Sequence, residues 1–174
     1  KIDKTSGATA RSWNSSYVSG KGTFKSYFQI EYPKAENITT QQFTYIKNHV
    51  NTFEKSLQEE NPLKALTTYR SMMDMPSFVN YFLLNELSRN VDGYRLSTYF
   101  YKDKDSKGGK LTMGPAWDYN LAFGNADYYD GYLPQGWVYN KLEMSEQGIA
   151  DGFQTPFWWG KLIRDSVFVN SVKR

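Results

Sequence analysis

Residues 85–125 read NELSRNVDGYRLSTYFYKDKDSKGGKLTMGPAWDYNLAFGN, and the architecture follows from this pattern. Residues 94–102 are rich in aromatic and β-branched side chains, which favour a strand. Residues 103–109 carry the Asp, Ser and Gly typical of a turn, and residues 110–113 can return antiparallel. The pattern predicts a β-hairpin.

Two aspartates flank this hairpin. Asp92 precedes the outgoing strand, and Asp118 follows the return strand. Because antiparallel pairing brings the start of one strand beside the end of its partner, we expect the two carboxylates to lie close together. Neighbouring carboxylates repel each other, and a shared proton, a cationic side chain or a divalent cation relieves that repulsion. Oxygen ligands of this kind suit Mg²⁺ or Mn²⁺, with phosphate completing the shell.

The same spacing permits a purely structural role for the pair. In that alternative Asp92 caps a turn before the strand, while Asp118 pairs with Arg89 or Arg95. Ion pairs perturb acidic groups as active sites do, so the spacing does not choose between the two interpretations.

Helices are predicted on both sides of the hairpin. Thr39 and Gln42 fit a capping box, and apolar residues then recur at helical spacing to about residue 57. Further helices are predicted after Pro62, from near Pro76 to Ser88 with apolar residues around most of its circumference, and after Pro156. Residues 24–32 predict a strand, whereas residues 6–22 and 119–152 lack regular periodicity. We expect an α+β fold in which helices surround a small antiparallel sheet.

Composition narrows the class of protein. A chain of 174 residues with 40% hydrophobic content can bury one core, so we expect residues 1–174 to form a single domain. The net charge is only +3 and the charges are scattered, which disfavours nucleic acid as a partner. There is no cysteine, which excludes thiol chemistry, and no apolar run reaches the length of a transmembrane helix.

Three runs of residues carry a resemblance to a known family. They are residues 85–95, 97–102 and 114–124, which contain an ordered set of rare Trp, Asp and Gly positions. Together they resemble the spore-coat protein H (CotH) kinase family, most clearly over residues 78–125 and more weakly over residues 28–57. Members of that family are similar to atypical protein kinases. The resemblance implies ATP and divalent metal as cofactors, a spore-coat or other surface protein as substrate, and a location in the cell envelope or spore coat.

The resemblance also implies roles for individual residues. Asp92 resembles the catalytic-loop aspartate that receives the proton of a Ser or Thr hydroxyl, and Asp118 resembles the metal-binding aspartate that follows the hairpin. A kinase catalytic loop places a metal-binding Asn five residues after its Asp, and that position is Ser97 here. Asn120 could take over as a metal ligand, although an Asx-type turn is an equally good role for it. Ser97 and Asn120 are therefore the remaining cofactor-binding candidates.

The sequence shows no glycine-rich phosphate loop and no strand lysine paired with a helix glutamate. We therefore expect residues 1–174 to be part of a longer protein that supplies the nucleotide-covering lobe, and the chain to be weakly active or inactive alone.

A second hypothesis comes from a cluster of aromatic residues in the irregular segment, Tyr128, Tyr129, Tyr132, Trp137 and Tyr139. Aromatic rings on a loop can stack on sugars or anchor a protein partner. Under this hypothesis the domain is a surface module that binds glycan or protein, with a structural metal and no catalysis. The rings could equally cover the core of their own loop.

Overall fold

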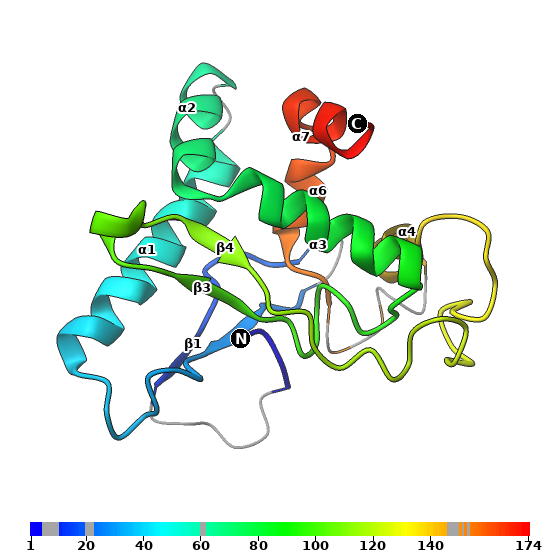
Figure 1. Cartoon of the computed structure of the whole chain (residues 1–174), viewed down its shortest axis with the longest axis horizontal. Coiled ribbons are helices and arrows are strands. Elements are labelled where there is room, and N and C mark those ends of the chain that lie inside the picture. Colours follow the sequence, from blue (N-terminus) through cyan, green and yellow to red (C-terminus); the bar gives the residue numbers. More distant parts are fainter. Residues whose placement is uncertain (5–10, 20–22, 60–61, 146–149, 151, 153) are drawn as a thin grey trace.

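The computed structural model describes residues 1–4, 11–19, 23–59, 62–145, 150, 152 and 154–174, and it is an α+β fold as predicted. The helices are α1 (Thr40–Gln58), α2 (Pro62–Met72), α3 (Met75–Ser88), α4 (Val138–Met144), α6 (Phe157–Leu162) and α7 (Ser166–Val172), with a 3₁₀ turn at Asp105–Lys107. The strands form two antiparallel pairs, β1 (Ser12–Asn14) with β2 (Tyr27–Gln29) and β3 (Phe100–Lys102) with β4 (Leu111–Met113). In Figure 1, α3 crosses the middle of the molecule, with the β3–β4 hairpin beside it.

Helix α1 confirms the predicted capping box. The Gln42 amide donates to Thr39 Oγ1, and the Thr39 amide donates to Gln42 Oε1. The two reciprocal bonds satisfy amides that the first helical turn would otherwise leave unpaired. Val50, Phe53 and Leu57 of the predicted apolar face are buried, so the helical spacing identified this face correctly.

The strand predicted at residues 24–32 is shorter than expected, because only Tyr27–Gln29 pair as β2. Their partner β1 lies within residues 6–22, which were expected to be irregular, so that expectation is corrected for residues 12–14. Ile2 bridges both Phe28 and Thr98, which joins the first sheet to the segment that leads into β3.

The hairpin is present, but its outgoing strand begins at Phe100 rather than at Tyr94. Tyr94 and Ser97 have φ angles of 71° and 46°, which are left-handed and incompatible with an extended strand. The ordered pairing is Phe100 with Met113 through to Lys102 with Leu111. Residues 92–97 are therefore a folded turn rather than the start of a strand.

Helix α6 supplies the centre of the core with two adjacent tryptophans. Trp158 stacks on Phe28 at 5.7 Å and meets Phe53 edge-on at 5.2 Å. Trp159 contacts α3 and the loop after it, where the ring centres of Tyr81 and Tyr94 lie 5.9 and 4.9 Å from its own. Both indoles are fully buried, so α6 joins the sheet side of the molecule to α3.

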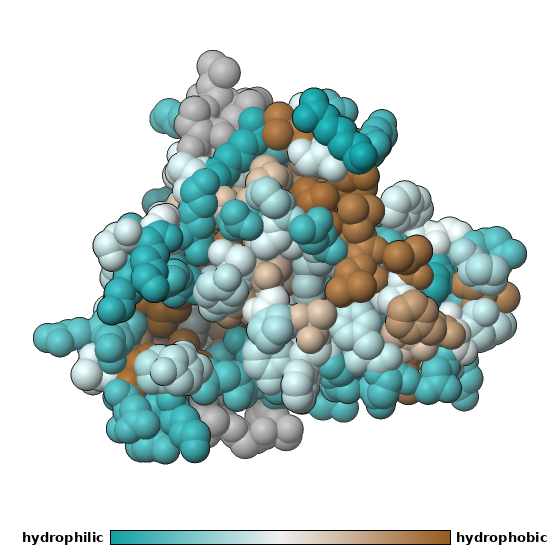
Figure 2. All heavy atoms as spheres, viewed as in Figure 1, coloured by the Kyte–Doolittle hydropathy of each residue, from teal (hydrophilic) through white to brown (hydrophobic). Residues whose placement is uncertain are grey.

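Helix α3 has apolar residues around most of its circumference, as the sequence showed, but not all of them are buried. Phe78, Val79, Tyr81, Phe82 and Asn85 are buried among its residues. The opposite face exposes apolar side chains, namely Leu83, Leu84 and Leu87, of which Leu87 is 81% exposed. Figure 2 shows apolar surface over this part of the molecule, between α3 and α7.

Helices α4 and α7 were not predicted. Helix α4 interrupts residues 119–152, which were expected to be irregular throughout. Helix α7 follows the predicted last helix after a break at Ile163–Asp165, and Asp165 caps it by accepting from the Val167 amide at 3.0 Å. Within the described residues, no helix is long and apolar enough to cross a membrane.

Candidate active site

The loop that carries Asp92 begins where α3 ends. Arg89 adopts a left-handed conformation, with φ of 55°, and closes the helix by donating its amide to the carbonyls of Asn85 and Glu86. This is the usual way to satisfy the last carbonyls of a helix, although Gly is the commoner residue there. The chain then turns sharply through Asn90 to Arg95.

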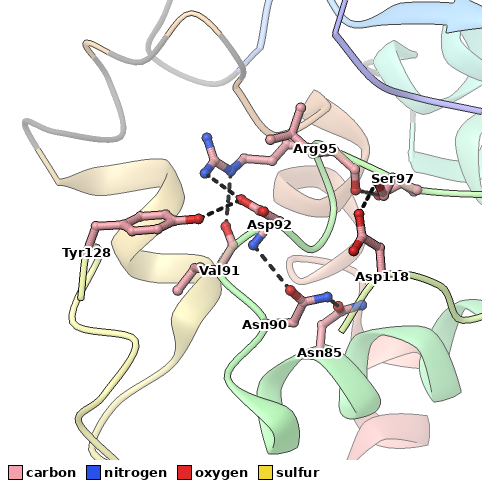
Figure 3. Close-up of polar contacts among 10 residues, drawn as sticks. Asn85, Asn90, Val91, Asp92, Arg95, Ser97, Asp118 and Tyr128 are labelled. Atoms are coloured by element: carbon pink, nitrogen blue, oxygen red, sulfur yellow. Dashed lines mark hydrogen bonds and ion pairs between the residues drawn. The ribbon is translucent and has the colours of Figure 1, made fainter. Parts of the chain in front are cut away.

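Asp92 is held through one of its two carboxylate oxygens. Oδ1 accepts from Arg95 Nη2 at 3.3 Å and from the Tyr128 hydroxyl at 3.1 Å (Figure 3). The Asp92 amide donates to Asn90 Oδ1 at 3.3 Å, which orients the backbone. The carboxylate is 23% exposed, so it is reachable from solvent.

Asp118 contacts Ser97 and not Asp92. Ser97 Oγ donates to Asp118 Oδ2 at 2.9 Å, and Figure 3 shows the two side chains pointing toward each other. The hairpin explains this contact. At its open end, the last backbone hydrogen bond between the two strands runs from the Gly114 amide to the Tyr99 carbonyl. Beyond that hydrogen bond, the chain before Tyr99 leads back to Ser97, and the chain after Gly114 leads on to Asp118. Asp92 lies further back, in the turn.

Asn120 is two residues from Asp118 in sequence, and no hydrogen bond between their side chains is found in the described part of the chain. Its side chain is exposed, and its backbone carbonyl accepts from Asn125 Nδ2 at 2.6 Å. The structure therefore brings Ser97 and Asp118 together and leaves Asn120 at the surface.

The alternative ion pairs of Asp118 are not found in the described part of the chain. Arg95 pairs with Asp92, and Arg89 donates to the carbonyls of Asp130 and Gly136. Asp118 is an exposed carboxylate with a hydroxyl donor as neighbour.

One buried amide connects the loops of both acids. Asn85 Oδ1 accepts from Asn90 Nδ2 at 3.1 Å and from the Tyr119 hydroxyl at 3.2 Å, while Asn85 Nδ2 donates to the Tyr81 carbonyl. Asn90 belongs to the loop of Asp92, and Tyr119 follows Asp118 directly. Burial raises the pKa of Tyr119 above its ordinary value, so its hydroxyl stays protonated and remains a donor.

Gly93 is required by the same network. A Cβ at this position would lie 2.3 Å from Asn85 Oδ1 and 2.9 Å from the Asn90 carbonyl. Only a residue without a side chain allows the backbone after Asp92 to approach the buried amide so closely.

Backbone strain concentrates in this region. Among the described residues, those other than Gly with positive φ are Arg89, Tyr94, Ser97, Asp118, Phe123, Tyr129 and Asp130. All of them fall between positions 89 and 130, and they include Ser97 and Asp118. Such conformations cost about 1 kcal/mol or more each and persist where surrounding contacts enforce them, which is common at functional sites.

Sequence reasoning missed the role of Glu86, and it named Tyr128 as a member of the aromatic cluster but not as a partner of Asp92. Glu86 accepts from the Tyr94 hydroxyl at 2.8 Å and from the amides of Val138 and Tyr139 at 2.7 and 2.9 Å, so it caps α4. Burial raises the pKa of its carboxyl. An acid inside the apolar run of α3 was a signal for such a role. The contact of Tyr128 with Asp92 had no local signal, because it depends on the path of an irregular segment.

The donor set fits a divalent cation only in part. No three His, Asp or Glu side chains gather into a metal-binding group in the described part of the chain. Mg²⁺, however, is commonly bound by one or two carboxylates together with substrate phosphates and water. Asp118, exposed and flanked by the Ser97 hydroxyl, fits such a shared shell and not an all-protein site.

The aromatic cluster mostly packs internally. Tyr129 and Tyr139 are buried, and the Trp137 ring stacks on Phe82 at 5.7 Å. Tyr132 and Trp137 are 58% and 49% exposed, so they alone of the five rings present large apolar surface. Packing within the molecule accounts for most of the cluster.

Comparison with protein families places the chain in a known one. The family model described as "CotH kinase protein" matches residues 3–174, nearly the whole chain. No curated protein and no solved structure matches the chain.

Proposed function

This chain belongs to the CotH kinase protein family, and from that premise we propose that it transfers the γ-phosphoryl group of ATP to a Ser or Thr hydroxyl of a protein substrate, with Mg²⁺ or Mn²⁺. The acceptor oxygen forms a bond to Pγ, the bond from Pγ to the ADP oxygen breaks, and the acceptor proton passes to a carboxylate.

Each acid has one role in this proposal. Asp92 orients the acceptor hydroxyl and receives its proton, for which its partly exposed carboxylate is suited. Asp118 is the metal ligand, with the Ser97 hydroxyl as a neighbouring oxygen group and Asn120 as a further candidate ligand two residues along the chain. The cation, when bound, neutralises charge that develops on the phosphoryl oxygens.

The observation that supports the proposal most directly is the network at Asn85. The amide ties the loop of Asp92 and the segment after Asp118 to one buried point on α3. Catalytic groups need fixed relative positions, and a shared buried anchor supplies them for two loops that are otherwise irregular.

Ser97 departs from the kinase pattern. Its hydroxyl donates to Asp118, which leaves its lone pairs free for a cation or a water molecule. A hydroxyl is a weaker ligand than an amide oxygen, so we propose one firmly bound cation at Asp118 and a second, weaker one only if Asn120 turns inward.

The nucleotide-covering part of the site is proposed to lie outside residues 1–174. In kinases a strand lysine pairs with a helix glutamate over the phosphates. Lys102 is on β3, but it is bonded to Asp105 at 2.7 Å and to the Tyr45 hydroxyl at 2.7 Å. We therefore expect low activity from the 174-residue chain alone, and equal turnover by this chain and the full-length protein would contradict that expectation.

The test uses the full-length protein with ATP and Mn²⁺. Calorimetry measures nucleotide binding, and transfer of labelled γ-phosphate measures catalysis. Asp118→Asn should weaken Mn²⁺-dependent ATP binding about tenfold or more, because a metal ligand is lost. Asp92→Asn should leave binding nearly unchanged and lower transfer about a hundredfold or more. Asp103→Asn, on the exposed hairpin turn, is the matched control and should change neither.

Three results would refute the kinase proposal. They are ATP binding that does not depend on metal, full transfer by Asp92→Asn, and an equal response of Asp103→Asn and Asp118→Asn. Glycan binding by a protein without any nucleotide response would favour the surface-module hypothesis instead.

A further inference from the structure

Tyr128 contacts the proposed catalytic carboxylate from outside its own loop. It lies on the irregular segment between β4 and α4, and its hydroxyl donates to Asp92 Oδ1 at 3.1 Å (Figure 3). Arg95 Nη2 reaches the same oxygen at 3.3 Å. Within the described residues no hydrogen bond reaches Asp92 Oδ2. In the described part of the chain, one carboxylate oxygen of Asp92 therefore accepts two hydrogen bonds and the other accepts none.

The segment that carries Tyr128 is held against the C-terminal end of α3 and the loop of Asp92 by close packing and hydrogen bonds. A Cβ on Gly131 would lie 2.8 Å from Val91 Cγ1, so the backbone packs directly on the residue before the aspartate. Arg89 Nη1 donates to the Gly136 carbonyl at 2.6 Å, and Nη2 donates to the Asp130 carbonyl at 3.0 Å. These three contacts, all within eight residues after Tyr128, restrain the segment from which its hydroxyl reaches the carboxylate.

The neighbouring tyrosine completes the arrangement. The Arg95 guanidinium lies 4.8 Å from the centre of the Tyr129 ring, and the rings of Tyr128 and Tyr129 meet edge-on at 5.5 Å. Stacking on an aromatic face restrains the guanidinium and keeps its charge near Asp92. Tyr129 has a φ of 52°, so the turn that sets the two rings apart is itself strained.

We infer that Tyr128 is a positioning residue for Asp92: together with Arg95 it anchors Oδ1, so that Oδ2 is presented to the acceptor hydroxyl. The inference rests on the proposed function, because it assigns Asp92 the role of receiving the proton. A free Asp side chain rotates about two bonds, and a carboxylate fixed by two donors spends more of its time in the productive rotamer.

Tyr128 is suited to act as a permanent donor. Burial, with the nearby charge of Asp92, raises the pKa of Tyr128 to about 12. Its hydroxyl therefore remains protonated throughout the neutral range and donates to the carboxylate at every pH at which the enzyme would work.

A competing explanation gives the opposite prediction. The Tyr128 hydroxyl could occupy the place of the substrate hydroxyl on Asp92 and so block the site. Removing it would then raise activity, whereas removing a positioning group lowers it.

The test compares Tyr128→Phe, Tyr132→Phe and Asp92→Asn in the full-length protein, with ATP, Mn²⁺ and a protein acceptor. Tyr128→Phe should lower kcat about tenfold while the KM values for ATP and acceptor stay within about twofold, since it removes one hydrogen bond to a charged group. Tyr132→Phe is the matched control, because Tyr132 lies on the same segment and is 58% exposed. It should keep the wild-type kcat. Thermal melts identify the temperature below which every variant is folded.

The outcomes separate the two proposals. Wild-type activity that survives Asp92→Asn refutes the proposed function itself. If Asp92→Asn is inactive but Tyr128→Phe keeps the wild-type kcat, the positioning role is refuted while the kinase proposal stands. A higher kcat for Tyr128→Phe would also overturn the positioning role and establish the blocking one.

Discussion

Glu54→Gln is expected to remove a pH dependence from the stability of this chain. Glu54 lies on α1 and is 1% exposed. Its Oε1 accepts from Ser15 Oγ at 2.8 Å and from Trp158 Nε1 at 2.9 Å. No partner for Oε2 is found among the described residues. Burial, opposed by these two hydrogen bonds, raises the pKa of the Glu54 carboxyl from 4.5 to about 7.

The sign of the effect follows from the direction of this change. The pKa of Glu54 is higher in the folded chain than in the unfolded one, so the folded state holds the proton more tightly between about pH 4.5 and pH 7. The stabilisation that comes from protonated Glu54 is fully present below about pH 4.5 and is lost as the pH rises through about 7. Since one pKa unit corresponds to about 1.36 kcal/mol, the loss is about 3 kcal/mol.

Glutamine isolates this contribution. Its carbonyl oxygen can accept the same two hydrogen bonds, and its side chain carries no charge at any pH. Glu54→Gln should therefore match the wild type near pH 4.5 and exceed its free energy of unfolding by about 3 kcal/mol at about pH 8.

The assay is urea unfolding of both proteins from about pH 5 to about pH 8, and the relevant quantity is the difference between them at each pH. Taking this difference cancels the pH dependence that other titratable groups contribute to both proteins. One such group is Glu143, for which burial also raises the pKa to about 7. Glu143→Gln is the matched control, because it should keep the pH dependence that belongs to Glu54. A difference between wild type and Glu54→Gln that stays constant with pH would refute the reasoning.

Two further predictions concern stability. Gly93→Ala should cost about 2 kcal/mol or more, because its Cβ would lie 2.3 Å from Asn85 Oδ1. An unchanged urea midpoint would contradict this close approach. Asp165→Asn should cost about 2 to 3 kcal/mol, because it leaves the partly buried Arg70 guanidinium without its carboxylate. The control is the exposed ion pair between Lys141 and Asp130. Lys141→Ala should lower the free energy of unfolding by less than about 1 kcal/mol in the same assay.

The helices that the sequence predicted are those with local signals. Helix α1 has a capping box and a regular apolar face, and both were found in the structure. Helix α4 has no such signal, because the side chain of its N-cap residue, Trp137, does not cap the helix and the cap comes from Glu86 on α3. A cap supplied from a distant element cannot be read from the residues around the helix.

The candidate site was predictable in its parts but not in its contacts. The hairpin was correctly identified, yet its strand begins six residues later than Tyr94 because Ser97 and its neighbours turn. Strand alternation cannot reveal a left-handed residue that is not glycine. The contact at 2.9 Å therefore joins Asp118 to Ser97 rather than to Asp92.

The amide of Asn85 also sets a limit on how independently the two acidic loops can change. Both lone pairs of its oxygen are taken, by Asn90 and Tyr119, and its nitrogen donates to the Tyr81 carbonyl. Because one oxygen accepts from both segments, a side chain without that acceptor would lose the bonds to Asn90 and to Tyr119 at once. The positions of the two acids would then change together rather than separately.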